Sequence, residues 1–257
     1  MNRHEFEQKI ERLDVSLFDA IDSQSNEGDR RSWLAVQRVI RRVKSEYTYL
    51  EIGSHLGGSL QQHVMDPRCR KIFSIDKRPL AQPDDRGQTY YYQGNSTERM
   101  LRNLRAICPT VDAKVVCFDS DTSGLDLTLI PEPVDFCFID GEHTREAVTA
   151  DFEFCLRVSA PNGAICFHDA SAIDMPIDGI LRSLRQQAIR FQAAKLGGDT
   201  FGVFLRDCPA LDDEAVKALA TSSRSWFRQR QLVRLTKTVL PGWLGPVTRP
   251  FGNWLRR

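Results

Sequence analysis

Four residues that could do acid–base or metal chemistry come in two pairs, and each pair directly follows an apolar run. Asp140 and His143 form the first pair, and His168 and Asp169 form the second. Imidazole titrates near neutral pH, so His143 and His168 are candidate general bases. Carboxylates bind hard divalent cations, so Asp140 and Asp169 are candidate metal ligands. A general base or a bound cation would each help to remove a proton from an acceptor hydroxyl.

The two apolar runs explain how these side chains would be brought together. Val134–Ile139 and Ala164–Phe167 are almost entirely apolar, which is typical of central strands of a parallel sheet, buried on both faces. In an open α/β sheet, ligands bind outside the carboxyl ends of the strands. We therefore expect both pairs to face one site.

An earlier strand and its exit turn indicate what that site binds. Tyr47–Ile52 carries Glu51 and runs into Gly53, and Gly57 follows four residues later. Glycine can adopt positive φ and lets a ligand lie against the backbone. A dinucleotide fingerprint needs a second glycine two residues after the first, and His55 stands there instead. This argues against an NAD(P)-dependent oxidoreductase, which remains the alternative enzyme.

Further strands are expected after this turn. Lys71–Asp76 ends in a carboxylate that can accept hydrogen bonds from ribose hydroxyls. Thr89–Ser96 indicates a third strand and its exit turn. Lys114–Asp121 is also strand-like, and its place in the sheet stays open, since its acidic residues either line the site or only end the strand.

Helical spacing of apolar residues predicts helices over residues 1–45, with Ser32 capping the second one. They would cover the sheet edge or the mouth of the site, or form a homodimer contact. A helix is also expected from Thr144 to Val158, after which Asn162-Gly163 makes a turn. The two runs within residues 190–205 predict a closing antiparallel hairpin.

Taken together, these motifs resemble class I S-adenosylmethionine-dependent methyltransferases. The residues that carry the resemblance are Glu51-x-Gly53-x-x-x-Gly57, the strand-end Asp76, Ile139-Asp140-Gly-Glu-His143-Thr, Asn162-Gly163 and Phe167-His168-Asp169. More closely, they resemble the bacterial subfamily with IDGxH and HD motifs, akin to sugar and natural-product O-methyltransferases and to cephalosporin hydroxylase-like proteins. The resemblance covers residues 47–205.

The resemblance implies an open, doubly wound, mostly parallel seven-stranded sheet, a Rossmann-like fold with a C-terminal antiparallel hairpin. It implies S-adenosylmethionine as cofactor, with Glu51 near the methionine end and Asn95 and Ser96 near the adenine. The implied cofactor-binding residues are Glu51, Gly53, Ser54, Gly57, Asp76, Asn95, Ser96 and Asp140. The implied catalytic residues are His143, His168 and Asp140.

A shared Mg²⁺ on Asp140 and Asp169 is the second mechanistic option. Related metal-dependent O-methyltransferases have carboxylates at these two strand ends, and in some an acidic or amide residue stands beside the second one. Here the neighbours are His168 and Ala170, so the resemblance leaves the metal open.

Composition limits the class of protein. The chain has 257 residues, of which 41% are hydrophobic and 27% charged, as expected for one globular domain with extensions. The expected parts are an N-terminal cover over 1–45, a methyltransferase domain over 46–207 and a tail over 208–257. Seven scattered cysteines argue against a disulfide scaffold and suit a reducing compartment. With no long apolar run and a charged N-terminus, a cytoplasmic location is expected.

The tail indicates a further partner. No acidic residue follows Glu214, and Trp226, Trp243 and Trp254 are interspersed with basic residues. This pattern favours an anionic membrane surface at its inner face, while the alternative is that tryptophan packs on the domain and the charges stay in water. The core shows no basic face, which argues against nucleic acid.

We therefore expect methyl transfer to a hydroxyl of a small molecule or glycan: a sugar, a glycolipid or a secondary metabolite. The non-enzymatic alternative is an inactive methyltransferase-like binding module tethered to a membrane.

Overall fold

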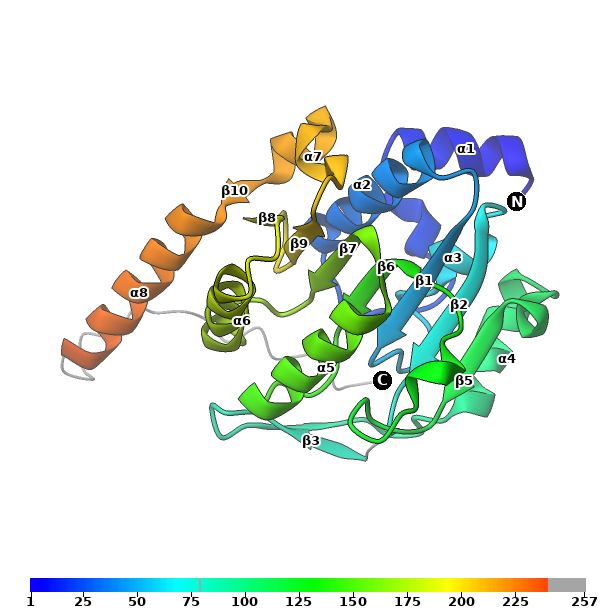
Figure 1. Cartoon of the computed structure of the whole chain (residues 1–257). Helices are drawn as coiled ribbons and strands as arrows, with labels where there is room; N and C mark the ends of the chain where they lie inside the picture. Colours follow the sequence, from blue (N-terminus) through cyan, green and yellow to red (C-terminus); the bar gives the residue numbers. More distant parts are fainter. Residues whose placement is uncertain (79, 240–257) are drawn as a thin grey trace.

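A computed structural model describes residues 1–78 and 80–239, which form an eight-stranded sheet with helices on both faces (Figure 1). The strand order is β10-β8-β9-β7-β6-β1-β2-β5. The strands of this sheet are β1 Tyr47–Ile52, β2 Cys69–Ile75, β5 Val115–Phe118, β6 Val134–Ile139, β7 Ser159–Phe167, β8 Phe191–Lys195, β9 Phe201–Leu205 and β10 Thr221–Ser222.

The five strands from β5 to β7 run parallel to one another. β9 is antiparallel to both of its neighbours, β7 and β8. This is the Rossmann-like methyltransferase arrangement with the expected closing hairpin. Among residues 1–78 and 80–239, the sheet has one strand more than the expected seven, the two-residue β10, which pairs with the edge of β8.

Helices cover both faces of the sheet because the strands are apolar on both sides. One face packs against α1 Arg3–Glu11, α2 Glu27–Val43, α3 Gln61–Met65 and α4 Thr97–Ile107, and the other against α5 Arg145–Val158, α6 Asp174–Gln186 and Trp226 of α8 Ser223–Val239. The remaining helix is α7 Glu214–Leu219, and 3-10 turns lie at Val15–Phe18, Val111–Ala113, Leu127–Leu129 and Pro209–Asp212.

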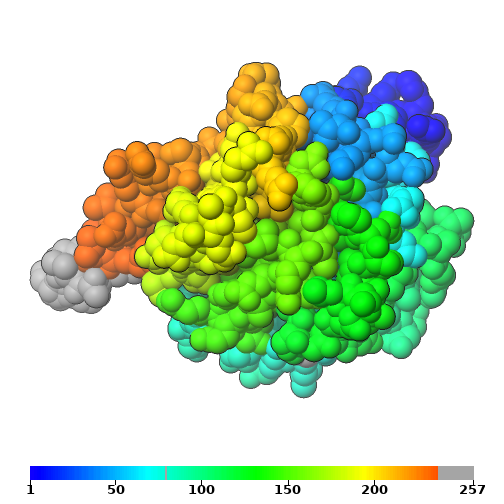
Figure 2. Space-filling view, in the orientation of Figure 1, coloured from blue at the N-terminus to red at the C-terminus, as the bar shows by residue number. Residues whose placement is uncertain are grey.

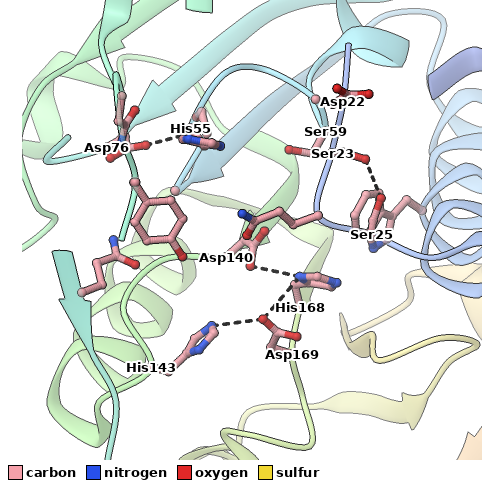
Figure 3. A pocket seen from close by; sticks show the side chains of 18 residues that line it. Asp22, Ser23, Ser25, His55, Ser59, Asp76, Asp140, His143, His168 and Asp169 are labelled. Carbon is pink, nitrogen blue, oxygen red and sulfur yellow. Dashed lines mark hydrogen bonds and ion pairs between the residues drawn. The ribbon is translucent and has the colours of Figure 1, made fainter. Parts of the chain in front are cut away.

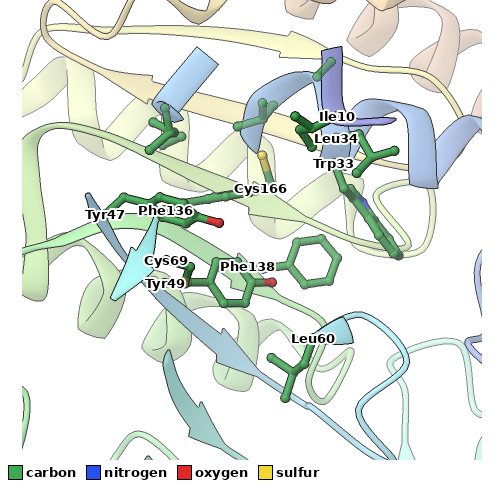
Figure 4. Packing of buried hydrophobic residues seen from close by; sticks show 14 of the residues in the cluster. Ile10, Trp33, Leu34, Tyr47, Tyr49, Leu60, Cys69, Phe136, Phe138 and Cys166 are labelled. Atoms are coloured by element: carbon green, nitrogen blue, oxygen red, sulfur yellow. The ribbon is translucent and has the colours of Figure 1, made fainter. Parts of the chain in front are cut away.

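The N-terminal helices share a core with the sheet. Leu34 and Trp33 of α2 and Ile10 of α1 belong to the same buried cluster as Tyr49 and Phe138 of the central strands (Figure 4). An Asn26–Asp29 capping box begins α2, so the prediction that Ser32 caps this helix is wrong. Ser32 lies within α2, where its hydroxyl donates to the carbonyl of Gly28.

Two segments take different places from those expected. Thr89–Tyr91 is β4, and it pairs only with β3 Ala81–Pro83 in a separate hairpin, so the prediction of a third sheet strand there is wrong. β5 pairs with β2 and takes the position in the sheet that was expected for the third strand. β5 has a buried residue and three half-buried ones, whereas all three residues of β4 are exposed. Burial beside β2 stabilises a strand only where the strand has apolar surface to remove from water.

Asn162-Gly163, expected as a turn, lies inside β7, where the pairing with β6 shifts register. After β1 the chain passes through a series of turns, and α3 begins at Gln61. By contrast, the helix expected after Thr144 is confirmed: Thr144 is the N-cap of α5, and its hydroxyl accepts from the backbone N–H of Ala147.

Backbone hydrogen bonds continue past the last residue of each central strand. Gly53 N–H donates to Ile75, Asp140 N–H to Ile52 and His168 N–H to Ile139, at 2.8 to 3.0 Å. Because these bonds join neighbouring parallel strands, the residues that follow the strands lie in one row at the carboxyl edge of the sheet.

The tail is described only to residue 239. Trp226 is buried and packs on Phe201, with ring centroids 5.1 Å apart, so this tryptophan follows the packing alternative. Trp243 and Trp254 lie outside the described residues. Within 1–78 and 80–239, no helix has both the length and the apolarity to cross a membrane.

Candidate functional site

A pocket lies at the carboxyl edge of the central strands, and its lining contains Asp140, His143, His168 and Asp169 (Figure 3). The lining residues are Asp22, Ser23, Gln24, Ser25, Trp33, Gly53, Ser54, His55, Gly58, Ser59, Asp76, Gln82, Tyr92, Asn95, Asp140, His143, His168 and Asp169. The predicted site residues Gly53, Ser54, Asp76 and Asn95 are therefore brought together with Asp140, His143, His168 and Asp169.

His168 lies between two carboxylates. Its Nδ1 is 3.1 Å from Oδ1 of Asp140, and its Nε2 is 3.4 Å from Oδ2 of Asp29. Asp29 comes from the first turn of α2, is only 1% exposed and also accepts from the backbone N–H of Asp199 at 2.5 Å. Trp33, one turn further along α2, meets the imidazole edge to face at 5.4 Å.

These partners decide the charge of His168. Burial by itself would lower the pKa of this imidazole, but the carboxylates of Asp140, Asp29 and Asp169 outweigh it and hold the pKa well above 6.5. His168 is therefore an imidazolium at neutral pH, with a carboxylate at each ring nitrogen. A ring in this state orients Asp140 and has no free lone pair with which to accept a proton.

His143 and Asp169 form the adjacent part of the cluster (Figure 3). Nε2 of His143 is 3.6 Å from Oδ2 of Asp169, whose backbone adopts the left-handed conformation, with φ of 47°. One potential ligand atom each from Asp140, His143 and Asp169 lies within 4.8 Å of the others. Two carboxylates and one imidazole are a donor set that a divalent cation accepts.

Gly53 allows the first strand to approach this cluster. Its φ is 87°, and a Cβ on it would lie 2.1 Å from the carbonyl oxygen of Asp140. A side chain here would push β1 away from β6 at the point where both contribute to the pocket. The glycine predicted from the turn pattern is therefore required by the close contact between two strand ends.

Asp76 stands on the opposite wall and is already hydrogen-bonded. One carboxylate oxygen accepts from the backbone N–H of His55 at 2.9 Å, and the other accepts from that of Arg78 at 2.8 Å. The guanidinium of Arg78 also donates to the Asn95 side chain at 3.1 Å. Arg78 thus ties together three segments of the pocket wall, although the sequence analysis did not single it out.

Three predicted cofactor-binding residues lie outside the pocket lining. Glu51 is fully buried behind it, because it shares a strand face with Tyr49, which packs under α3. Its oxygens accept from Tyr49 and Ser59, both at 2.6 Å, and burial raises the pKa of Glu51 to about 8 despite these two donors. Gly57 faces the side chains of α4, and Ser96 caps that helix.

A second, smaller pocket adjoins the first and shares Gly53, Asp76 and Gln82 with it. Apolar side chains form part of this pocket, among them Ile52, Ile75 and Ala147. Ser120 and Asp121, which follow β5, also line it.

Two segments enclose the first pocket: the N-terminal segment, for which the mouth of the site was one of the expected places, and the β3–β4 hairpin, which was not expected there. Residues 22–25 and Trp33 come from the N-terminal helical segment, and Gln82 and Tyr92 come from the β3–β4 hairpin region. The hairpin is held near the site by a backbone bridge between Asp84 and His143. The available signal was composition: residues 22–25 are polar in a segment otherwise rich in buried apolar side chains.

Comparison with known proteins supports the fold. Residues 50–170 match the model of a methyltransferase domain. This range contains Asp76, Asp140, His143, His168 and Asp169. An uncharacterized protein, R132, of Acanthamoeba polyphaga mimivirus is 25% identical over 132 residues. That match covers 49% of this chain and 52% of the viral protein, so the chain spans about half the length of this curated relative.

Two solved structures illustrate the likeness in fold. The O-methyltransferase NovP superposes with a TM-score of 0.52 at 16% identity, covering 68% of this chain and 78% of NovP. The O-methyltransferase TomG of Streptomyces achromogenes, solved with S-adenosylmethionine, gives a TM-score of 0.46 at 16% identity, covering 78% and 89%. The match over residues 50–170 indicates a methyltransferase domain, and the superposition on NovP shows that the two chains share a fold.

Proposed function

We propose that this chain transfers a methyl group from S-adenosylmethionine to a hydroxyl oxygen of a sugar, a glycolipid or a secondary metabolite. The observation that carries the proposal is the cluster of Asp140, His143, His168 and Asp169 in one pocket, opposite the buried carboxylate of Asp76. The subfamily resemblance through the IDGxH and HD motifs supports a hydroxyl acceptor, as does the likeness in fold to the O-methyltransferase NovP.

The two adjoining pockets fit the cofactor. We propose that the adenine occupies the smaller one, between Ile75 and Ala147, and that Asp76 binds the ribose hydroxyls. The methionine end would then extend past Gly53 into the larger pocket. This arrangement moves the adenine contacts from Asn95 and Ser96 to Ser120 and Asp121, because β5 and not β4 is the third strand.

Bound S-adenosylmethionine supplies an electrophilic methyl group, and the chain has to position and activate the acceptor oxygen. We assign His143 as the general base, because its contact with Asp169 at 3.6 Å is looser than those that hold His168. His168 acts by position: as a cation between Asp29 and Asp140, it fixes the Asp140 carboxylate at the pocket.

The same cluster fits a divalent cation. Asp140, His143 and Asp169 would hold it, and Ala170 adds no ligand after Asp169. A bound cation would lower the pKa of an acceptor hydroxyl and orient vicinal hydroxyls. Because the three donors include one imidazole, Mn²⁺ is a more suitable probe than Mg²⁺ alone.

Polar groups on the acceptor side favour a hydroxylated substrate. Ser23, Gln24 and Ser25 line the pocket together with Trp33 and Tyr92. Hydroxyl and amide groups can donate to and accept from sugar hydroxyls, while aromatic rings cover the apolar face of a sugar ring. This composition supports a glycan or glycosylated acceptor.

Calorimetric titration with S-adenosylmethionine, S-adenosylhomocysteine and NADH, each with and without Mn²⁺, tests the cofactor. We expect micromolar binding of the first two and none of NADH, and loss of binding in Asp76→Ala. Transfer of a labelled methyl group to a panel of glycosides and phenols then tests the acceptor, with His143→Asn as the inactive comparison. Binding of NADH alone would assign an oxidoreductase. Tight S-adenosylmethionine binding without turnover on any acceptor would favour the inactive module.

A further inference from the structure

The outer side of α8 and the adjoining end of α6 form a surface that the proposed chemistry does not use. α8 extends away from the body beside α6, as Figures 1 and 2 show. Only part of this helix is buried: Trp226 packs on Phe201, and Arg230 pairs with Asp174 at 2.8 Å. Arg224, Arg228 and Leu232, on another side of the helix, are exposed.

That side presents cations without local partners. Arg224 and Arg228 are exposed, one helical turn apart, and neither forms an ion pair with any residue in the described part of the chain. No acidic residue occurs in α8 at all. Together with Arg185 of α6, they line a groove between the two helices that has Met175 and Phe227 among its apolar walls. The only acidic side chain of that lining is Asp178, which pairs with Arg182.

Apolar side chains are exposed next to these cations. Leu232, one turn beyond Arg228, is 62% exposed, Val233 is 42% exposed and Met175 is 46% exposed. Leu232 and Val233 lie outside the groove lining. A peptide bound in the groove would therefore leave them in water, whereas a flat amphiphilic surface could cover them and the arginines together.

We propose that this α6–α8 surface docks on an anionic lipid bilayer. Arg224 and Arg228 would pair with lipid phosphates, and their aliphatic stems would extend along the interface. Leu232 and Val233 would enter the boundary between head groups and acyl chains. The proposal rests on charge and exposure outside the methyltransferase pocket, so it holds whether or not the proposed reaction is correct.

Cosedimentation of the full chain with vesicles tests this docking. We expect partitioning onto vesicles of equal parts phosphatidylglycerol and phosphatidylcholine, weakening as salt rises, and little onto phosphatidylcholine alone. Each basic residue near an anionic surface contributes about a fivefold gain, so Arg224→Gln with Arg228→Gln should lower the partition coefficient about 30-fold. Leu232→Ser should lower it about fivefold.

Matched controls separate this surface from net charge. Arg12→Gln with Arg102→Gln removes the same charge from two exposed arginines, one at the C-cap of α1 and one on α4, that also lack an ion pair in the described chain. This double variant should partition like the wild type. Leu129→Ser is the control for Leu232→Ser, since Leu129 is 48% exposed elsewhere.

Three results would overturn the proposal. The first is failure of the wild type to bind anionic vesicles at low salt. The second is equal loss in the Arg224/Arg228 and Arg12/Arg102 pairs. The third is binding to poly-glutamate that depends on Arg224 and Arg228 but not on Leu232, with none to vesicles, which would assign the groove to an acidic polypeptide.

Discussion

Replacing Glu51 by Gln should change how the stability of the protein depends on pH. Glu51 is fully buried, its two oxygens accept from Tyr49 and Ser59, and its pKa is about 8 compared with an ordinary value of 4.5. Between these values the folded protein binds a proton that the unfolded chain has lost. The wild type therefore loses stability as pH rises from about 4.5 to about 8, and the loss ends above that range.

The size of the effect follows from the same linkage. A full proton difference changes the free energy of unfolding by about 1.4 kcal/mol per pH unit. Because the difference falls to half a proton at about pH 8, the change between about pH 5.5 and pH 8 is about 3 kcal/mol. Gln is neutral at every pH and nearly isosteric. The free-energy difference between Glu51→Gln and wild type should therefore shift by about 3 kcal/mol in favour of the variant over this range.

Urea unfolding at several pH values, followed by the fluorescence of the buried Trp33 and Trp226, measures this difference. Glu153→Gln, at an exposed position of α5, is the matched control and should show no such trend. A pH-independent difference for Glu51→Gln would mean that Glu51 is ionised throughout, and the argument from burial would be refuted. Because Glu51 lies behind Ser59, the variant should also keep its affinity for S-adenosylmethionine.

Three further predictions concern contacts at the site and the anchoring of α8. Gly53→Ala should lower the free energy of unfolding by about 2 to 5 kcal/mol and weaken S-adenosylmethionine binding, because a Cβ at φ of 87° would collide with the Asp140 carbonyl. Urea unfolding and calorimetry measure the two effects, and wild-type values for both would contradict the contact. Asp29→Ala should lower the free energy of unfolding, measured in urea, by about 3 kcal/mol, because His168 loses one of its carboxylate partners. The control Asn26→Ala removes only the cap of α2 and should lower it by about 1 kcal/mol. Equal losses would mean that Asp29 acts only as a capping residue. Trp226→Ala should cost about 3 kcal/mol by the same assay, and an unchanged midpoint would show that α8 is not anchored by this side chain.

The sequence by itself determined the sheet and the edge at which the site lies. Apolar runs that end at Asp76, Asp140 and His168 can only be buried parallel strands, and parallel strands bring their carboxyl ends to one side. Gly53 could be predicted for a similar reason, since a sharp turn after a buried strand favours a residue without a side chain.

Only the tertiary structure decided which strand-like segment joins the sheet. Thr89–Tyr91 and Val115–Phe118 both favour extended backbone, and pairing with β2 was decided by burial, which depends on what packs above each segment. This one choice moved the proposed adenine contacts from Asn95 and Ser96 to Ser120 and Asp121. Strand alternation likewise turned Glu51 away from the pocket.

For His168, the sequence determined the position of the residue and the tertiary structure decided its charge. Its place after a buried strand followed from the sequence, but its role depends on Asp29, which lies 139 positions earlier in the chain and reaches it only because α2 packs across the sheet. Local sequence patterns record periodicity and turns, whereas a pKa is set by whatever charges surround a group in space. For that reason the sequence could identify the ionisable residues of the site, and the fold alone decided which of them is free to accept a proton.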